Sequence, residues 1–211
     1  MQKKDPKTHS FHYHELEIDL HPEVYDPAED SFLLLETIQV TPYNTVLELG
    51  TGCGVIALNC AYKGSHVICT DINPFAVQLT RKNIERNRTL LKGSIEVREG
   101  DLFSVLHKNE RFDIVIFNPP YLPTMKTEKV GGWFDVATDG GRDGLRVTKQ
   151  FICGLPHHLS TKGQAYFIFS SLSNRTRLEA HLKNEGFSFK VSAHRRFEGE
   201  DLDVYWIAPV D

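Results

Sequence analysis

The chain alternates short apolar runs with longer amphipathic segments over most of its length. Apolar runs of this kind predict buried β-strands, and the amphipathic segments between them predict helices that cover a sheet. The predicted strands span residues 45–49, 66–70, 94–98, 113–117, 165–170, 187–191 and 203–208. Strands and helices in alternation predict an α/β fold with a mostly parallel sheet and helices on both faces.

Helices are predicted from Pro27 onward and over residues 55–62, 73–87 and 173–184. Pro27 suits the first turn of a helix, and Glu29 and Asp30 suit the positive end of its dipole. No helical segment separates the last two strands, so we expect them to form an antiparallel hairpin. Residues 122–143 contain two Gly-Gly pairs and little periodicity, and a loop of that length in a compact domain is usually functional.

Residues 1–24 are polar and rich in histidine, with His9, His12, His14 and His21. The HxxHxH spacing of the first three is compatible with a metal site, whereas a polar segment of this kind is more often a solvated tail or part of a purification tag. We therefore expect a tail and lead-in over residues 1–24 and a single domain over residues 25–211.

Composition narrows the class of protein. Hydrophobic residues make up 40% and charged residues 25% of the chain, as in ordinary globular domains. No apolar run approaches membrane-spanning length and no secretory signal is present, so the expected location is the cytoplasm. The net charge of -4 lacks the excess of Lys and Arg that proteins gripping long nucleic acids carry, which favours a protein or small-molecule substrate.

The four cysteines, Cys53, Cys60, Cys69 and Cys153, contain no CxxC pair. In an intracellular chain we expect them to be core residues or free thiols rather than a disulfide framework or a zinc site.

A glycine-rich segment follows the first predicted strand and begins the next helix. It reads Glu48-Leu49-Gly50-Thr51-Gly52-Cys53-Gly54. Gly50 and Gly52 allow a sharp turn and the close approach of a ligand to the backbone. Asp71 ends the next strand, 21 residues after Gly50, where a carboxylate can bind both hydroxyls of a ribose. Together these features predict a nucleotide-type cofactor site.

The glycine spacing alone does not separate NAD from S-adenosylmethionine, but two features favour the latter. The loop lacks the third glycine of the dinucleotide fingerprint. The charge of Glu48 would repel a pyrophosphate and attract the cationic amino acid end of S-adenosylmethionine. Asp101 and Leu102 follow the third strand, where Asp101 can either accept from the adenine amine or cap a turn.

The fourth strand leads directly into Asn118-Pro119-Pro120-Tyr121. The prolines end the strand and provide no N–H donors, so carbonyl groups there stay free to accept from a ligand. If the Asn118 side-chain oxygen and the Pro119 carbonyl each accept one N–H of a planar nitrogen, they hold it facing a methyl donor with its lone pair localised. Tyr121 can stack on the planar group. The segment therefore predicts methyl transfer to an amide or aromatic nitrogen without a strong general base.

The glycine loop, Asp71 and the Asn-Pro-Pro-Tyr segment, in this order, resemble the HemK-like N5-glutamine methyltransferases. Residues 25–35 also resemble the Y-E-P-A-E-D-[ST]-F-L-L-L signature of their short eukaryotic and archaeal branch, with Asp26 in place of the usual Glu. The resemblance covers roughly residues 22–208 and implies a Rossmann-like class I methyltransferase fold with a seven-stranded sheet. It also implies methyl transfer from S-adenosylmethionine to the glutamine of a Gly-Gly-Gln motif in a class I translation release factor.

The resemblance and the motifs together give a set of expected site residues. Those expected around S-adenosylmethionine are Ser31, Glu48, Gly50, Gly52, Asp71, Asp101, Leu102 and Asn118. Those expected around the substrate glutamine are Asn118, Pro119, Pro120 and Tyr121, of which Asn118, Pro119 and Tyr121 are the expected catalytic residues. No metal ligand is predicted.

The same resemblance identifies a substrate-side loop and a partner. Residues 139–145 match the GG-x-[DN]-G segment of the family, whereas residues 133–139 depart from the A-W-A-G-G run of the branch. Members of the branch often pair with a small zinc-binding activator that covers an apolar edge near the third strand. Residues 94–98 are either such an exposed edge or an edge guarded by charge.

Three alternatives stay open at this point. A nucleic-acid adenine-N6 or guanine-N2 methyltransferase would use the same Asn-Pro-Pro-Tyr segment together with a basic surface. Its available cluster is Arg81, Lys82, Arg86 and Arg88, which is more often a solvated helix face, and no segment is left over for a target-recognition domain. The intact Asn-Pro-Pro-Tyr segment disfavours an inactive cofactor-binding subunit, and the glycine spacing disfavours a nicotinamide oxidoreductase.

Overall fold

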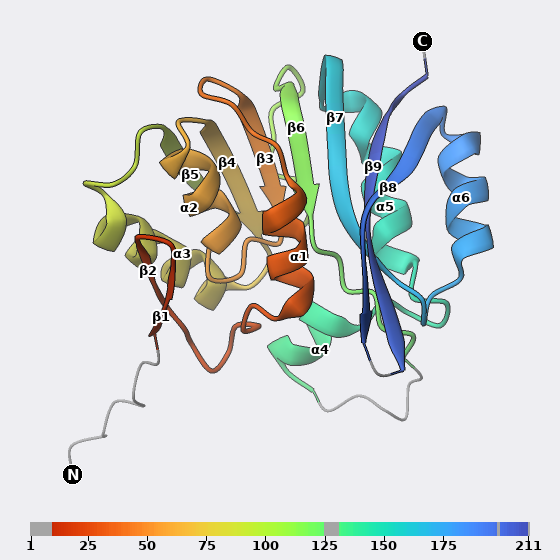
Figure 1. The fold of residues 1–211 in the computed structure, drawn as a ribbon, viewed down its shortest axis with the longest axis horizontal. Coiled ribbons are helices and arrows are strands. Elements are labelled where there is room, and N and C mark those ends of the chain that lie inside the picture. The colour runs from red at the N-terminus through yellow and green to blue at the C-terminus, as the bar shows by residue number, and fades with distance from the viewer. Residues whose placement is uncertain (1–9, 125–130, 198, 211) are drawn as a thin grey trace.

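The computed structural model describes residues 10–124, 131–197 and 199–210. A seven-stranded sheet, in the order β5-β4-β3-β6-β7-β9-β8, runs through its centre (Figure 1). Neighbouring strands from β5 to β7 pair in parallel, and β9 pairs antiparallel with both β7 and β8. The strands are β3 (Thr45–Leu49), β4 (His66–Asp71), β5 (Ser94–Glu99), β6 (Phe112–Phe117), β7 (Leu159–Ser170), β8 (Phe187–Phe197) and β9 (Glu200–Pro209). The predicted fold class is confirmed.

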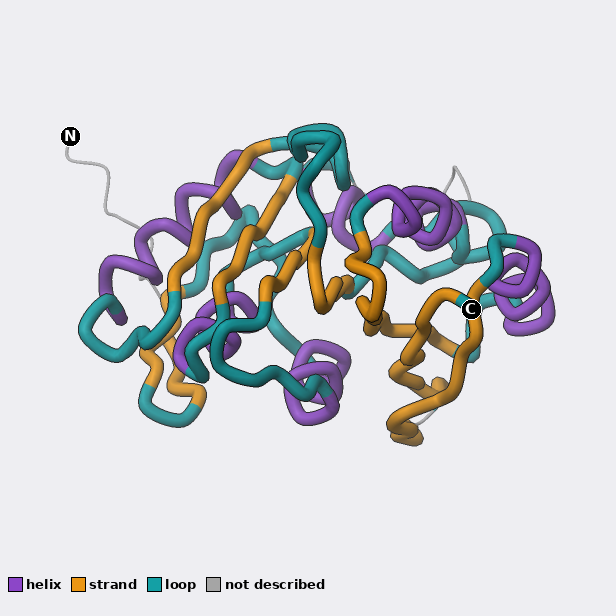
Figure 2. Tube along the Cα trace, turned by 90° about the horizontal axis from the view of Figure 1, so that it is seen from above, coloured by secondary structure: helices purple, strands orange, loops and turns teal. Residues whose placement is uncertain are grey.

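Helices cover both faces of this sheet (Figure 2). They are α1 (Glu29–Thr37), α2 (Val55–Tyr62), α3 (Pro74–Asn87), α4 (Trp133–Thr138), α5 (Arg146–Gly154), α6 (Arg175–Asn184) and the short 3-10 helix η2 (Leu155–His157). Because side chains alternate along a strand, Ile114 and Ile116 of β6 pack with α1, α2 and α3, and Val115 and Phe117 pack with α5 and α6. No helix in the described part of the chain combines the length and apolar character needed to cross a bilayer.

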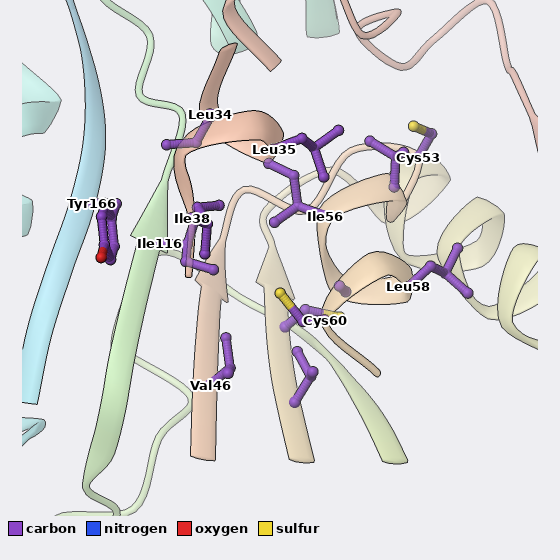
Figure 3. Packing of buried hydrophobic residues seen from close by; sticks show 14 of the residues in the cluster. Leu34, Leu35, Ile38, Val46, Cys53, Ile56, Leu58, Cys60, Ile116 and Tyr166 are labelled. Atoms are coloured by element: carbon purple, nitrogen blue, oxygen red, sulfur yellow. The ribbon is translucent and has the colours of Figure 1, made fainter. Parts of the chain in front are cut away.

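The first of these two cores attaches α1 to the sheet. Leu34 and Leu35 of α1 are buried with Ile56 of α2 and with Val46 and Ile116 of the sheet (Figure 3). Burying one leucine side chain stabilises a fold by about 1.5–3 kcal/mol. These contacts fix α1 against the sheet, so that its first turn lies near the carboxyl end of β6.

Most predicted elements occur within a few residues of their predicted bounds, and the exceptions have physical reasons. The sequence pattern does not predict α5, in which Thr148, Phe151 and Ile152 are the buried residues among charged and β-branched neighbours. Parallel pairing of β6 with β7 nevertheless requires such a crossover. The loop expected over residues 122–143 contains α4. Strands β8 and β9 are longer than predicted, because antiparallel pairing continues into polar residues such as His194.

Residues 10–19 form a hairpin, where a solvated tail was expected. β1 (Ser10–Tyr13) pairs antiparallel with β2 (Leu16–Asp19), and Leu16 and Ile18 are buried in the first core. The prediction of a solvated tail is therefore wrong for this segment, because two apolar residues at alternate positions attach a short strand to the core. In the described part of the chain, His12 and His14 belong to no group of side chains that could hold a metal ion, and His9 lies outside the described residues.

Asn83 of α3 holds β2 and the glycine loop together. Its Nδ2 donates to the carbonyl oxygens of Asp19 and Cys53, and its Oδ1 accepts from the Asp19 N–H. The carboxylate of Asp19 also forms ion pairs with Lys82 at 2.9 Å and with Arg86 at 3.2 Å. The Asn83 side chain is fully buried, so these backbone groups have no access to water as an alternative partner.

We expect Asn83→Ala to lower the free energy of unfolding by about 2 kcal/mol, because it leaves buried groups of Asp19 and Cys53 without partners. Urea denaturation followed by circular dichroism measures this loss. Arg88→Ala is the matched control, since the ion pair of Arg88 with Glu85 is exposed, and it should change stability by less than about 0.5 kcal/mol. Equal stability of the two variants would contradict this account of Asn83.

Candidate active site

A cavity of about 730 Å³ opens at the carboxyl ends of β3, β4 and β6. This edge is the lower one in Figure 1, beside α1 and α4. The carboxyl ends of parallel strands meet at one edge of a sheet, so residues that follow different strands are brought together there. Every residue that the sequence predicts for the site lines this cavity: Ser31, Glu48, Gly50, Gly52, Asp71, Asp101, Leu102, Asn118, Pro119, Pro120 and Tyr121.

The glycine loop between β3 and α2 requires its glycines for backbone conformation. Gly50, Gly52 and Gly54 have φ angles of 65°, 56° and 83°, in the left-handed region that favours glycine. A Cβ on Gly54 would lie 2.8 Å from Cγ2 of Thr80, so the loop packs directly onto α3. Thr80 also donates from Oγ1 to the Gly52 carbonyl at 3.0 Å. The loop is therefore held between β3 and α3, with Gly50 and Gly52 on the cavity wall.

Asp71 is the last residue of β4 and is nearly buried. Its Oδ2 accepts from the Gly52 N–H at 2.9 Å, and its Oδ1 accepts from the Asn73 N–H at 2.8 Å. Burial raises the pKa of this carboxyl, and the backbone donors oppose the rise. A carboxylate offers about four lone-pair sites, so Asp71 keeps capacity to accept from hydroxyl groups of a ribose.

Glu48 is buried at the end of β3, with an exposed fraction of 2%. Its Oε2 accepts from Oγ1 of Thr51 at 2.8 Å and from the Ala57 N–H at 3.0 Å. Burial raises the pKa of Glu48 to about 8, and these two hydrogen bonds only partly offset the rise. The carboxyl is therefore mostly protonated at pH 7 until a cation lies beside it. From the sequence alone, Glu48 was expected to carry a fixed negative charge.

Asp101 and Leu102 lie at the rim of the cavity after β5. The Ser104 N–H donates to the backbone carbonyl of Asp101, so the Asp101 side chain does not form this contact of the turn. Leu102 has a φ of 46°, in the left-handed region that a branched side chain rarely adopts, and its carbonyl accepts from Oγ1 of Thr70 at 3.3 Å. The strained turn presents the exposed Asp101 carboxylate at the mouth of the cavity.

The buried carboxylate of Asp30, in the first turn of α1, accepts five hydrogen bonds. Its Oδ1 accepts from the N–H of Ser31 at 2.6 Å and from the Ser31 hydroxyl at 3.1 Å. Its Oδ2 accepts from the hydroxyls of Tyr25 and Tyr121, both at 3.2 Å. Nδ2 of Asn118 donates to the same oxygen at 3.0 Å. Asp30 therefore links α1 to the segment that follows β6.

This contact sets the orientation of the Asn118 amide. A carboxylate only accepts hydrogen bonds, so the amide turns its Nδ2 donors toward Asp30. Its Oδ1 is buried and has no hydrogen-bond partner among the described residues. The Pro119 carbonyl also receives no hydrogen bond within the described ranges. An unpaired buried acceptor costs about 1–3 kcal/mol, so N–H groups of a ligand would be stabilised at this point of the cavity.

Known proteins share both the sequence and the fold of this chain. A family model described as methyltransferase small domain matches residues 23–133. The "putative protein N5-glutamine methyltransferase" of Methanocaldococcus jannaschii is 40% identical over 190 residues, which are 90% of this chain and 93% of that protein. Methyltransferase HEMK2 of Homo sapiens is 30% identical over 193 residues, covering 86% of this chain and 88% of that protein. The chain belongs to the methyltransferase small domain family, among the HemK-like proteins.

A solved structure agrees with the fold of this methyltransferase. The E. cuniculi Mtq2–Trm112 complex, described as responsible for methylation of the eRF1 translation termination factor, matches with a TM-score of 0.66. The match covers 90% of this chain and 99% of that chain at 23% identity, a level that carries the fold alone.

The glycine-rich residues 140–144 of the methyltransferase pack against the Asn-Pro-Pro-Tyr segment. A Cβ on Gly140 would lie 2.8 Å from the Pro120 carbonyl oxygen, and one on Gly144 would lie 2.5 Å from the Tyr121 carbonyl oxygen. Oγ of Ser173 donates to that same Tyr121 carbonyl at 2.8 Å. The loop that sequence analysis places on the substrate side therefore contacts the backbone of the predicted substrate site, and only glycine leaves room for the contact.

Several residues of the methyltransferase cavity are absent from the sequence-based set. From the sequence, Asp30 is a charge that suits the start of a helix and, like Tyr25, a member of the family signature, with no role in the site assigned to either. Burial and the charge of Asp30 raise the pKa values of Tyr25 and Tyr121, so both hydroxyls remain donors. Trp133 and Phe134 of α4 also line the cavity, in a stretch whose lack of periodicity predicts no helix.

The pKa of Glu48 predicts a pH dependence of stability. The folded value of about 8 lies above the ordinary value of 4.5, so the unfolded chain loses this proton at lower pH. The contribution of Glu48 to stability is therefore present below about pH 4.5 and is lost as the pH rises through 8. Glu48→Gln removes the titration, so we expect its stability relative to wild type to increase by about 3 kcal/mol between about pH 5.5 and pH 8.

Urea denaturation of both proteins without ligand, at the two pH values, measures this difference. A difference between Glu48→Gln and wild type that does not change with pH would show that Glu48 is already charged in the folded protein.

Proposed function

We propose that this protein transfers a methyl group from S-adenosylmethionine to the side-chain amide nitrogen of the glutamine in the Gly-Gly-Gln motif of a peptide chain release factor. The observation that carries the proposal is the orientation of Asn118, whose Nδ2 bonds to Asp30 while its buried Oδ1 has no partner among the described residues. A primary amide has two N–H donors in one plane. Asn118 Oδ1 and the Pro119 carbonyl supply two neighbouring acceptors for them.

The chemistry of the cavity wall fits S-adenosylmethionine. When bound, this cofactor supplies an electrophilic methyl group on a cationic sulfur. Asp71 would accept from its ribose, and Glu48 would become charged beside its cationic amino acid end. Asp101 at the rim would accept from the adenine amine. A dinucleotide fits less well, because its pyrophosphate offers no cation beside which Glu48 would become charged, and the loop lacks the third glycine of the dinucleotide fingerprint.

The residues after β6 would make the amide nitrogen reactive. An amide nitrogen is a poor nucleophile because its lone pair is delocalised into the carbonyl group. Acceptors for both N–H groups, Asn118 Oδ1 and the Pro119 carbonyl, would fix the nitrogen and favour localisation of that pair. The pair would form the new bond to the methyl carbon while the carbon–sulfur bond breaks and its electrons leave on the sulfur, and the nitrogen would then release one proton to solvent. Tyr121 would stack on the planar amide, and no strong base is required.

The choice of glutamine and of a release factor rests on the relatives. The M. jannaschii protein, which aligns with nearly the whole chain, carries N5-glutamine chemistry in its name. The E. cuniculi complex of the same fold is described as acting on a translation termination factor. These two observations agree with the planar nitrogen that the Asn118 geometry favours.

The charges around the cavity favour a peptide over a nucleic acid as substrate. Arg146 is the only Lys or Arg among the described residues that line it. The lining carboxylates are Asp30, Glu48, Asp71, Asp101, Asp135 and Asp139. A surface of this sign disfavours phosphates.

The basic cluster that a nucleic-acid enzyme would use lies on α3, where its members already have partners. Lys82 and Arg86 pair with the carboxylate of Asp19. Arg88 pairs with Glu85, and Arg81 donates to the carbonyl of Val97. These contacts reduce the charge available for a phosphate backbone, so the nucleic-acid alternative loses its main support.

We also infer that a small zinc-binding activator subunit covers the sheet edge at β5. This strand is the last in the sheet order, so one of its two edges has no neighbouring strand. Ile95 and Val97 alternate with exposed polar residues along it and are only half-buried. The E. cuniculi relative in fold forms a complex with Trm112, which supports a partner of this kind.

Purified protein, with and without a Trm112-type activator, should transfer label from S-adenosylmethionine to a release factor that carries Gly-Gly-Gln. Replacing that glutamine by glutamate should abolish labelling, because a carboxylate has no N–H groups to hold and no nitrogen to methylate. Scintillation counting of the separated factor measures the transfer. Label in tRNA, rRNA or DNA offered in parallel, with none in the factor, would sink the proposal.

Asp30→Asn should lower kcat by about 100-fold while leaving the Kd for S-adenosylmethionine nearly unchanged, because an amide at this position no longer fixes the orientation of Asn118. Asn118→Ala should lower the rate at least as much. Single-turnover methyl transfer and calorimetric titration with the cofactor measure the two effects separately.

Asp71→Ala is the matched control, and it should weaken cofactor binding by about tenfold or more through the loss of charged hydrogen bonds. A near-normal rate for Asn118→Ala would refute the role given to Asn118. An unchanged cofactor affinity for Asp71→Ala would count against the ribose contact.

A further inference from the structure

We propose that Cys153, His181 and Glu185 form a binding site for a divalent transition-metal ion such as Zn²⁺. These side chains lie on α5 and at the end of α6, and none of them lines the cavity described above. From the sequence, Cys153 is expected to be a core residue or free thiol, because the four cysteines contain no CxxC pair. The proposal is independent of the proposed function.

The three side chains come from two neighbouring helices. Cys153 lies in the last turn of α5, His181 lies in the last turn of α6, and Glu185 caps that helix. Residues four apart on a helix share one face, so His181 and Glu185 form a pair, and Cys153 completes the group from the adjacent helix. One ligand atom from each residue lies within 4.8 Å of the other two.

The spacing of the sulfur and the imidazole nitrogen matches that around a bound ion. Sγ of Cys153 lies 3.6 Å from Nε2 of His181. A tetrahedral zinc ion, with a Zn–S distance of about 2.3 Å and a Zn–N distance of about 2.0–2.1 Å, places these atoms about 3.5 Å apart. The pair therefore needs little movement to bind the ion. Cys153 and Glu185 are exposed, so an ion can reach the site and retain a water as its fourth ligand.

The donor set selects the class of metal. One thiolate, one imidazole and one carboxylate suit Zn²⁺ and related transition-metal ions, whereas Mg²⁺ and Ca²⁺ take oxygen ligands. Within the described ranges, this is the only group of three or more His, Cys, Asp and Glu side chains close enough together to hold a metal ion.

The surroundings of the cysteine favour a cation. The carboxylate of Glu185 places negative charge beside the Cys153 sulfur. The carboxyl end of α6 adds partial negative charge. One positive charge also lies in the last turn of α6, that of Lys183, whose Nζ is 5.9 Å from the centre of the Phe189 ring. A divalent ion would replace the thiol proton and balance these negative charges.

The topology puts this site at the far end of the fold. α5 connects the parallel strands β6 and β7, and α6 connects β7 to β8, so both helices run back toward the amino ends of the strands. Their carboxyl ends therefore lie at the edge of the sheet opposite the active-site cavity (Figure 1). An ion bound there would join α5 to α6 and stabilise the folded chain, because it binds the folded state more tightly than the unfolded one.

The test uses the full chain, freed of metal with a chelator and titrated with Co²⁺ and then Zn²⁺. Wild type should show a thiolate-to-cobalt charge-transfer absorption that Zn²⁺ removes by competition. Cys153→Ser and His181→Ala should weaken binding by about tenfold or more. Zinc at several times its Kd should raise the wild-type Tm by about 3 °C. It should also slow alkylation of Cys153, which is the exposed thiol while Cys53, Cys60 and Cys69 are buried.

A double variant, His12→Ala with His14→Ala, controls for binding by the N-terminal histidines and should bind cobalt as wild type does. Glu185→Gln keeps the thiol and the imidazole and should bind more weakly than wild type while folding normally. No thiolate absorption and no protection of Cys153 in wild type would overturn the proposal. Binding that survives Cys153→Ser and His181→Ala would overturn it as well. Methyl transfer is not measured, so these outcomes are separate from those that test the proposed function.

Discussion

The carboxylate of Asp30 is the contact on which the arrangement of the Asn-Pro-Pro-Tyr end of the cavity depends. Its hydrogen bonds come from Tyr25, from α1 and from the segment after β6. Because a carboxylate cannot donate, each of these groups points its donor inward, and the oxygens of Asn118 and Pro119 are left for the cavity. Asp30 stays in this position because Leu34 and Leu35 pack α1 onto the sheet. Helix packing therefore fixes which end of the Asn118 amide faces the cavity.

The cofactor end depends on α3 in a comparable way. Asn83 and Thr80 donate to the carbonyls of Cys53 and Gly52, so side chains of a helix replace the partners that a tight glycine loop cannot supply from its own backbone. Asn83 also bonds to β2 at Asp19, which makes the N-terminal hairpin part of the support of the loop. A segment with a polar, tail-like composition thus contributes to the geometry of the cofactor site.

The parts of the fold that could be predicted are those in which local pattern and tertiary environment agree. Strand β3 and helix α2 have the bounds that their apolar runs predict, because both are buried on all sides. Residues at the carboxyl ends of parallel strands, such as Asp71 and Asn118, could be placed together because that topology leaves one edge for them.

The parts that could not be predicted depend on contacts that are distant in sequence. Asp30 bonds to Asn118 and Tyr121, which are 88 and 91 residues away, and the helix dipole alone gives a sufficient local reason for an acid at this position. The hairpin at residues 10–19 is hidden by its polar composition, since Leu16 and Ile18 are its only buried apolar side chains. The sequence pattern indicates which hydrogen bonds a side chain is able to form, and the structure shows which of its atoms already have partners.

Two of the buried carboxyl groups that line the cavity, those of Asp30 and Glu48, differ in how many hydrogen bonds they already accept. Asp30 accepts five hydrogen bonds, and each of its donors is held in a fixed direction, so the acceptor end of the site has one geometry. Glu48 accepts two, and its pKa of about 8 leaves it protonated at neutral pH until a cation arrives. Under the proposed function, the cofactor end would therefore change its charge on binding, while the substrate end would keep its hydrogen-bond directions. The alignment of the methyl acceptor would then be independent of the electrostatic adjustment that admits the methyl donor.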